Sequence, residues 1–290
     1  MTPSDILLFT SSSSGTGRDN NDKSNKIREA ILFEGFHGRT ETMFTDPLYG
    51  NDWRKLAEDF NTALNELGGS GPITLKSKGG RTFNYDFLVK RDDCEHKVEF
   101  KFGGTSVQTL PEFFNPAANK PFHDELYANM FYDEHLPAIT TLYGLTPPSK
   151  TDYIKEIYKN QSKHSFFTSF QEAEKSHMEL YSQKRTLVAA SIKAYLEKVK
   201  DTTKLDALTS EFMRSQSGKR FLIYNEGKFY HDRISDAELT AKSVVGVRNG
   251  NILVIQSAES NTTHEMLLRW KNHLGVLFPA WQISMRRLAR

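Results

Sequence analysis

Two short stretches on either side of residue 92 carry an apolar residue at every second position. The first runs from 83 to 89 and the second from 98 to 102. A two-residue period is typical of half-buried strands, and Asp92-Asp93 between the stretches favours a tight turn. We therefore predict a β-hairpin over residues 81–103. One face of the hairpin is apolar, and the other carries Asp86, Glu99 and Lys101.

The register of this hairpin follows from its turn. If the turn is centred on Asp92-Asp93, Asp86 lies opposite Glu99 and Asn84 lies opposite Lys101. Directly opposed residues have Cβ atoms roughly 5 Å apart, so two facing carboxylates repel each other. A divalent cation between them would remove the conflict, and Mg²⁺ suits a site with one or two carboxylates. Lys101 shares this face, where it could orient or deprotonate a water. The alternative is an ordinary solvent-facing polar row.

The segments before and after the hairpin show helical and strand periods. Apolar spacing predicts helices over 27–34 and 51–67, a strand over 73–78, a helix over 122–135 and a strand over 138–143. Further helices are expected over 153–160, 169–181 and 186–199. The last third of the chain predicts hairpins over 221–230 and 244–256, a helix over 265–273 and a strand over 281–285. The C-terminal strands either extend the first sheet or build a second layer.

The pattern of Asp86 followed by Glu99-Phe100-Lys101 resembles the D…(D/E)-x-K signature of the PD-(D/E)xK nuclease superfamily. The resemblance implies an α/β (α+β) fold with a restriction-endonuclease-like αβββαβ core, in which helices flank a central mixed sheet. The order helix, strand, strand, strand matches the start of that core. We expect a flexible arm over 1–25 and a single domain over 26–290. This domain would have its core at 26–145, a helical insertion at 150–205 and a β-rich part at 215–290.

The same resemblance implies roles for individual residues. Asp86, Glu99 and the backbone carbonyl of Phe100 would hold Mg²⁺, for which Mn²⁺ substitutes, and Lys101 would position the attacking water. Some members of the superfamily add a helix glutamate, for which Glu34 is the candidate. Others use a polar residue after the ExK strand, which Gln108 fits loosely. Those families carry that residue on an uninterrupted helix, whereas prolines interrupt the segment after Gln108.

The overall composition says little about function, but the local distribution of charge and cysteine is informative. The formal net charge is +2, so the overall charge does not require a nucleic-acid partner. After Glu265 there is no acidic residue, and Arg286 and Arg287 belong to a basic end that could meet phosphates. The chain has one cysteine, Cys94, which excludes an internal disulfide and fits a reducing compartment. No signal peptide or membrane span is recognisable, so we expect an intracellular protein of the cytoplasm or nucleus.

These expectations describe a Mg²⁺-dependent nuclease, with DNA favoured over RNA because most of the superfamily cuts DNA. A DNA endonuclease of the restriction type is the first interpretation. The alternatives are a nucleic-acid-binding protein that keeps the fold without cutting, an RNA-cleaving endonuclease, and a structural α/β protein in which Asp86 and Glu99 never meet. Many restriction-type enzymes dimerise, so a homodimer is one of the expected oligomeric states.

Overall fold

The chain is a mixed α/β protein, and the residues that the structure describes form one five-stranded mixed sheet and one four-stranded antiparallel sheet. The computed structural model describes residues 28–39, 44–47, 50–78, 83–110, 114–159, 162–273 and 276–288. The arm expected over 1–25 lies outside these residues. The chain divides into two compact units, the first comprising residues 1–110 and 215–235 and the second residues 111–214 and 236–290. This division differs from the expected single domain with its core at 26–145.

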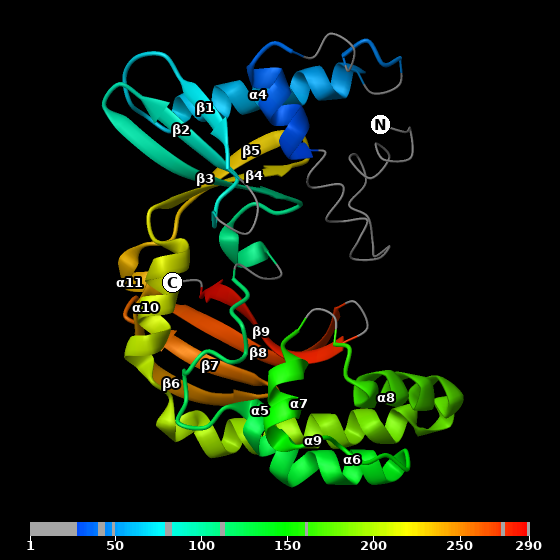
Figure 1. The fold of residues 1–290 in the computed structure, drawn as a ribbon. Helices are drawn as coiled ribbons and strands as arrows, with labels where there is room; N and C mark the ends of the chain where they lie inside the picture. The colour runs from blue at the N-terminus through cyan, green and yellow to red at the C-terminus, as the bar shows by residue number, and fades with distance from the viewer. Residues whose placement is uncertain are drawn as a thin grey trace. The chain divides into compact units, whose positions relative to one another are not determined.

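The first unit contains the mixed sheet. Its strands are β1 (Thr74–Ser77), β2 (Phe87–Arg91), β3 (Cys94–Phe102), β4 (Lys219–Asn225) and β5 (Lys228–Asp232), and they lie side by side in that order (Figure 1). Neighbouring strands are antiparallel except β3 and β4, which are parallel. The hairpin predicted over 221–230 is confirmed as β4 and β5.

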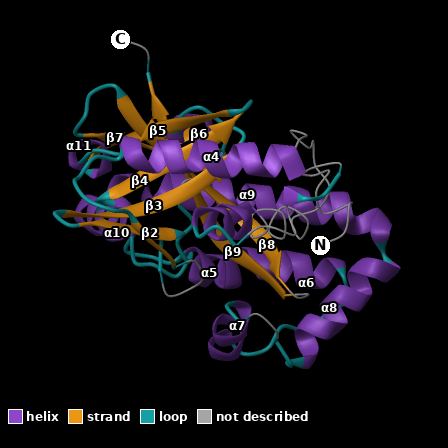
Figure 2. Cartoon of the chain, turned by 90° about the horizontal axis from the view of Figure 1, so that it is seen from above, coloured by secondary structure: helices purple, strands orange, loops and turns teal. Residues whose placement is uncertain are grey.

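Helices cover one face of this sheet. The helix over residues 28–36 and α4 (Gly50–Glu66) confirm the two helices expected before the hairpin, and Figure 2 shows α4 lying across the strands. Ile31, Trp53 and Phe60 are buried with Phe87 and Val98 in one apolar cluster. Because successive side chains of a strand alternate between faces, the apolar row of β3 points to these helices. The other row, with Glu99 and Lys101, points to the opposite face.

The register of the central hairpin is confirmed, but the hairpin is shorter than predicted. Phe87 pairs with Val98 and Arg91 with Cys94, so the turn is centred where the sequence placed it. The regular ladder ends at Phe87, and residues 84–86 form bends instead of a strand. Asn84 therefore does not pair with Lys101. Its side-chain amide donates to the carbonyl of Ser215 at 2.7 Å.

A long connection joins the parallel strands β3 and β4, as parallel pairing requires. It starts with a short 3₁₀ turn, η1 (Val107–Thr109), and ends with α10 (Leu205–Gln216), which the sequence analysis missed. Gly218, with φ 74°, follows α10 and admits a left-handed backbone that other residues rarely adopt. The strand after this connection is β4, whereas the sequence analysis had placed the corresponding core strand at 138–143.

The second unit consists of helices and an antiparallel sheet. The helices are α5 (Tyr127–Met130), the π-helical turn η2 (Phe131–His135), α6 (Leu136–Leu142), α7 (Lys150–Ile157), α8 (Ser165–Ser176), α9 (Tyr181–Val199), α10 and α11 (Asp236–Leu239), with 3₁₀ turns η3 (Met178–Leu180) and η4 (Lys200–Thr202). The strands are β6 (Ala241–Arg248), β7 (Ile252–Ser257), β8 (Thr262–His273) and β9 (Val276–Arg287), paired in that order. The turn at Asn249-Gly250 is confirmed, since both residues have positive φ.

Two predicted elements of the second unit are wrong. The strand expected over 138–143 is the helix α6, which has Pro137 in its first turn, where proline is well tolerated. The hydroxyl of Thr140 donates to the carbonyl of Leu136 at 3.1 Å within this helix, although threonine favours strands. The helix expected over 265–273 is part of β8, because pairing with β9 along its whole length outweighs the local apolar spacing.

Among the helices that the structure describes, none combines the length and the apolar character that spanning a bilayer requires.

Candidate active site

Asp86 directly precedes β2, and its side chain accepts a hydrogen bond from the backbone of β3. The N–H of Asp86 donates to the carbonyl of Val98 at 3.0 Å, just beyond the last regular pair. Carboxylate oxygen Oδ2 accepts a hydrogen bond from the N–H of Phe100 at 2.8 Å. No described residue hydrogen-bonds Oδ1. One oxygen thus fixes the carboxylate against β3.

Glu99 sits between two lysines on the sheet face opposite the helices. Oε1 lies 2.6 Å from Nζ of Lys101, and Oε2 lies 3.2 Å from Nζ of Lys219. The side chains of Glu99 and Lys219 are only 14% and 4% exposed. Burial by itself raises the pKa of Glu99, but the attraction of the ammonium groups of Lys101 and Lys219 together outweighs this effect, so the net shift is downward. Glu99 is therefore a charged carboxylate held in a fixed position.

Asp86 carries the opposite shift. Burial, followed by repulsion from Glu99 and Glu29, raises the pKa of Asp86 to about 7, although Lys101 acts against this rise. The two acidic groups predicted to face each other thus interact electrostatically. A pair of nearby carboxylates with divergent pKa values is characteristic of functional sites.

The two lysines also differ from each other. Burial lowers the pKa of Lys101, yet attraction to Glu99 dominates and leaves it raised. For Lys219 burial dominates over Glu99, and its pKa is lowered. No local sequence pattern points to Lys219, because it stands 120 residues from Glu99 and reaches the site only through the parallel pairing of β3 with β4.

The helix over 28–36 contributes Glu29 rather than the expected Glu34. Glu29 raises the pKa of both Asp86 and Lys101. Glu34 forms an ion pair with Arg39, with 2.9 Å between Oε2 and Nε, and both side chains are exposed. Residues five apart on a helix point about 140° away from each other, so both glutamates cannot face one site. A metal-ligand role for Glu34 therefore gains no support from this geometry.

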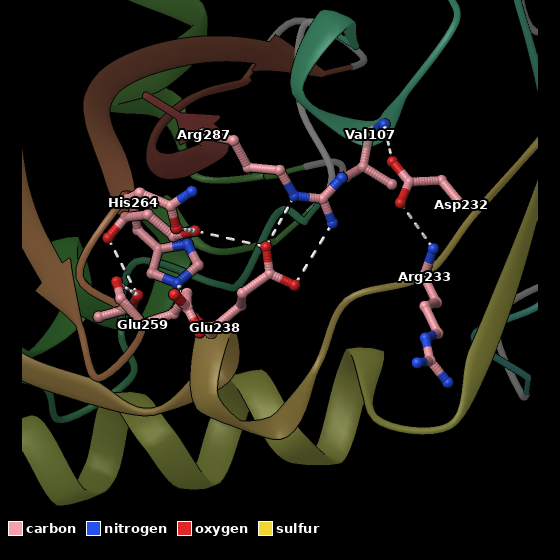
Figure 3. Close-up of polar contacts among 10 residues, drawn as sticks. Val107, Asp232, Arg233, Glu238, Glu259, His264 and Arg287 are labelled. Atoms are coloured by element: carbon pink, nitrogen blue, oxygen red, sulfur yellow. Dashed lines mark hydrogen bonds and ion pairs between the residues drawn. The ribbon is translucent and has the colours of Figure 1, made fainter. Parts of the chain in front are cut away.

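Gln108 lies in the turn η1, after β3. Asp232, at the end of β5, holds this turn by accepting a hydrogen bond from the N–H of Val107 at 2.8 Å (Figure 3). A short 3₁₀ turn agrees with the expectation that no long helix follows β3. The auxiliary role of Gln108 stays a prediction.

The two C-terminal arginines form ion pairs within the second unit. Arg287 donates from Nε to Oε1 of Glu238 at 2.7 Å, with its second contact at 3.3 Å (Figure 3). Arg286 lies 3.4 Å from Glu265, and half of its side chain is exposed. Arg287 is less exposed, at 23%, and its charge is largely compensated. The predicted phosphate contact therefore fits Arg286 better than Arg287, and it stays a prediction for both.

The donor set suits Mg²⁺ better than a metal that needs more side-chain ligands. Asp86 and Glu99 supply two carboxylates, and the described residues contain no cluster of three or more His, Cys, Asp or Glu side chains arranged for a metal. Zinc sites normally take three or four such ligands, whereas Mg²⁺ keeps several waters and binds one or two carboxylates with substrate phosphates. The two carboxylates, with the negative charge of Glu99, fit that second pattern.

The shifted pKa of Asp86 predicts how the metal-free first unit responds to pH. Its pKa is near 3.9 in an unfolded chain and about 7 in the fold. Between these values the folded state binds more protons, so the free energy of unfolding falls as pH rises from 4 to 7, by on the order of a few kcal/mol. Glu99 contributes little change in this range, because its lowered pKa acts at more acidic pH.

Replacing Asp86 with asparagine removes this titration. Urea unfolding of the first unit in EDTA, at pH 5 and pH 8, is expected to show a clear loss of stability for the wild type. The Asp86→Asn variant should show much less. An equal loss in both proteins would mean that Asp86 is not the group responsible.

Comparison of the chain with protein-family models, with curated proteins and with solved structures found no match. The combination of Asp86, Glu99 and two lysines therefore has to be interpreted from its own geometry.

Proposed function

We propose that the first unit is a restriction-endonuclease-like domain that hydrolyses phosphodiester bonds in nucleic acid with Mg²⁺. The observation that carries this proposal is the grouping of Asp86, Glu99 and Lys101 on neighbouring ends of β2 and β3, with the pKa values of the two carboxylates shifted in opposite directions. A surface polar row would leave these groups in water with ordinary pKa values.

The arrangement of the elements gives additional support. Helices precede β1, β2 and β3, and α10 precedes β4, which lies parallel to β3. This is the αβββαβ order that the resemblance to the PD-(D/E)xK superfamily implies. One departure is that most of α10 belongs to the second unit, so the connection between β3 and β4 carries the helical part of that unit, whereas its sheet, β6–β9, follows β5.

Each residue of the site has a distinct part in the proposed reaction. Asp86, Glu99 and the carbonyl of Phe100 would hold Mg²⁺, which supplies charge to polarise the phosphate and to acidify a bound water. Lys101, one third exposed, reaches the solvent side, where it positions the water and balances negative charge that develops on the phosphate. Lys219 is buried and fixes Oε2 of Glu99. DNA is the expected substrate, following the bulk of the superfamily.

A second candidate is a nucleic-acid-binding protein that does not cut. It is favoured by one observation: both oxygens of Glu99 contact lysines. The charge of Glu99 is thus compensated within the protein. Such a protein would bind nucleic acid with the same affinity in Mg²⁺ and in EDTA and would leave the strands intact.

A cutting assay separates the two candidates. Purified protein is incubated with plasmid DNA, single-stranded circular DNA and a folded RNA, each in Mg²⁺, Mn²⁺ or EDTA. The proposal predicts cutting of at least one substrate in both metals, none in EDTA, and none by the Asp86→Asn variant. Binding without cutting under all conditions would favour the second candidate, and cutting by Asp86→Asn at the wild-type rate would reject this site.

A further inference from the structure

A cavity of about 400 Å³ lies wholly within the second unit, and none of the residues of the site around Asp86 lines it. Its wall comes from η2, α6, α7, α8, α9 and β8, and Figure 1 shows α6, α8 and α9 grouped together. Volumes of this order are those of small-molecule sites, which are mostly apolar and carry a few polar groups. The cavity contains groups of both kinds, and they indicate what it could hold.

Aromatic rings make up much of the wall. Tyr153 and Phe167 are stacked with their centroids 5.7 Å apart, and Phe170 and Trp270 also line the space. Tyr153 is almost fully buried, and Phe167 is 8% exposed. Phe170 and Trp270 are only partly buried, so their rings leave surface in the cavity on which another planar ring can stack, and nucleobases are bound by such stacking without regard to sequence.

Two arginines line the same cavity without an acidic partner. Arg185 of α9 and Arg269 of β8 are exposed, and no carboxylate in the described part of the chain pairs with either. Lys184 differs, because it is buried and forms an ion pair with Glu174. The guanidinium of Arg185 lies 5.9 Å from the ring centroid of Tyr181, which also lines the cavity. Guanidinium groups without an acidic partner favour a phosphate, which arginine binds through two parallel hydrogen bonds.

Two amide side chains complete the polar lining. Gln171 and Asn251 both face the cavity, and no described residue hydrogen-bonds either side-chain amide. An amide both donates and accepts, so it can pair with the polar edge of a base. A hydrocarbon chain would leave these groups unsatisfied, and a volume of about 400 Å³ is too small for a peptide helix.

We infer that this cavity binds one nucleotide unit, with the base stacked on the aromatic wall and the phosphate at Arg185 and Arg269. The nucleotide is either a free one in solution or one nucleotide of a nucleic-acid strand, whose base unstacks from its neighbours to enter the cavity. The inference rests on the second unit alone, so it stands whether or not the first unit cuts nucleic acid.

Binding to the full-length protein in EDTA tests the inference without any cutting. The probes are the eight common nucleoside 5′-monophosphates and a single-stranded oligonucleotide, measured by calorimetry and by fluorescence anisotropy. The test variants are Arg185→Gln and Arg269→Gln, both at exposed positions where the fold should tolerate the change. The matched control is Lys193→Gln, an exposed position of α9 that does not line the cavity.

Each arginine variant is expected to weaken binding by about tenfold or more, as loss of a charged hydrogen bond does, and the control should bind as the wild type. If only the oligonucleotide binds, and removing one base from it weakens binding, the strand is the source. If monophosphates bind, the free nucleotide is the source. The inference is overturned if no probe binds saturably, or if the double arginine variant binds as tightly as the wild type.

Discussion

Replacing Glu99 with glutamine is expected to reduce the free energy of unfolding of the first unit by about 3–5 kcal/mol, the usual effect of removing one partner from a buried ion pair. Two ammonium groups depend on this carboxylate, and Lys219 is 4% exposed. Without Glu99, Lys219 would keep a buried charge with no counterion in contact. We therefore expect the loss to be partly recovered in the double variant Glu99→Gln/Lys219→Met.

Hydrogen exchange of peptides from β3 and β4, followed during urea unfolding, measures this effect within the first unit alone. A local measurement is needed because two compact units can unfold separately. The matched control is Glu95→Gln on the same strand, where an exposed pair with Lys90, 2.5 Å apart, contributes little. Equal stabilities of the Glu99 and Glu95 variants would contradict the buried cluster described above.

The second large effect is expected for Lys101→Met, which should slow single-turnover cutting by about 10²–10³-fold, as removal of one group that stabilises transition-state charge commonly does. Methionine keeps the length of the side chain while removing its charge. Glu99 would keep its contact with Lys219, so the variant should remain folded. The loss should therefore lie in the rate of cutting and not in the amount of folded protein.

Lys97→Met is the matched control for this rate. Lys97 points to the same face of β3, two residues before Glu99, and is exposed. The control should cut at nearly the wild-type rate, because its ammonium group takes no part in the cluster around Glu99. If both lysine variants cut equally fast, Lys101 has no special role. If both lose cutting equally, the effect comes from general attraction of nucleic acid to this face.

The sequence predicted the central hairpin well because its signals are local. Alternating apolar residues and the Asp92-Asp93 turn determine the register, which the pairing of Phe87 with Val98 confirms. The position of Glu99 beside Lys101 follows from that register. The shorter β2 could not be foreseen, because the alternation continues through residue 83 although the chain bends at 84–86.

Contacts between distant segments leave no local pattern in the sequence. Lys219 reaches Glu99 only because β4 pairs parallel to β3 after a long connection, and no local pattern announces such a pairing. Glu29 and Glu34 both lie on the helix over 28–36, and its orientation on the sheet decides which one acts on Asp86. In the second unit, pairing with β9 made β8 a strand in spite of its helix-like spacing.

The central claim is that Asp86 and Glu99 together hold a divalent cation, and titration of the protein with Mn²⁺ followed by electron paramagnetic resonance tests it most directly. The titration is done with and without a duplex that carries uncleavable linkages, because phosphates can complete the site. Glu34→Gln is the matched control, since Glu34 pairs with Arg39 away from the cluster. We predict one tight Mn²⁺ site in the wild type and in Glu34→Gln, and its loss in both Asp86→Asn and Glu99→Gln. Unchanged Mn²⁺ binding in the latter two variants, or no tight site in the wild type with the duplex present, would contradict the claim.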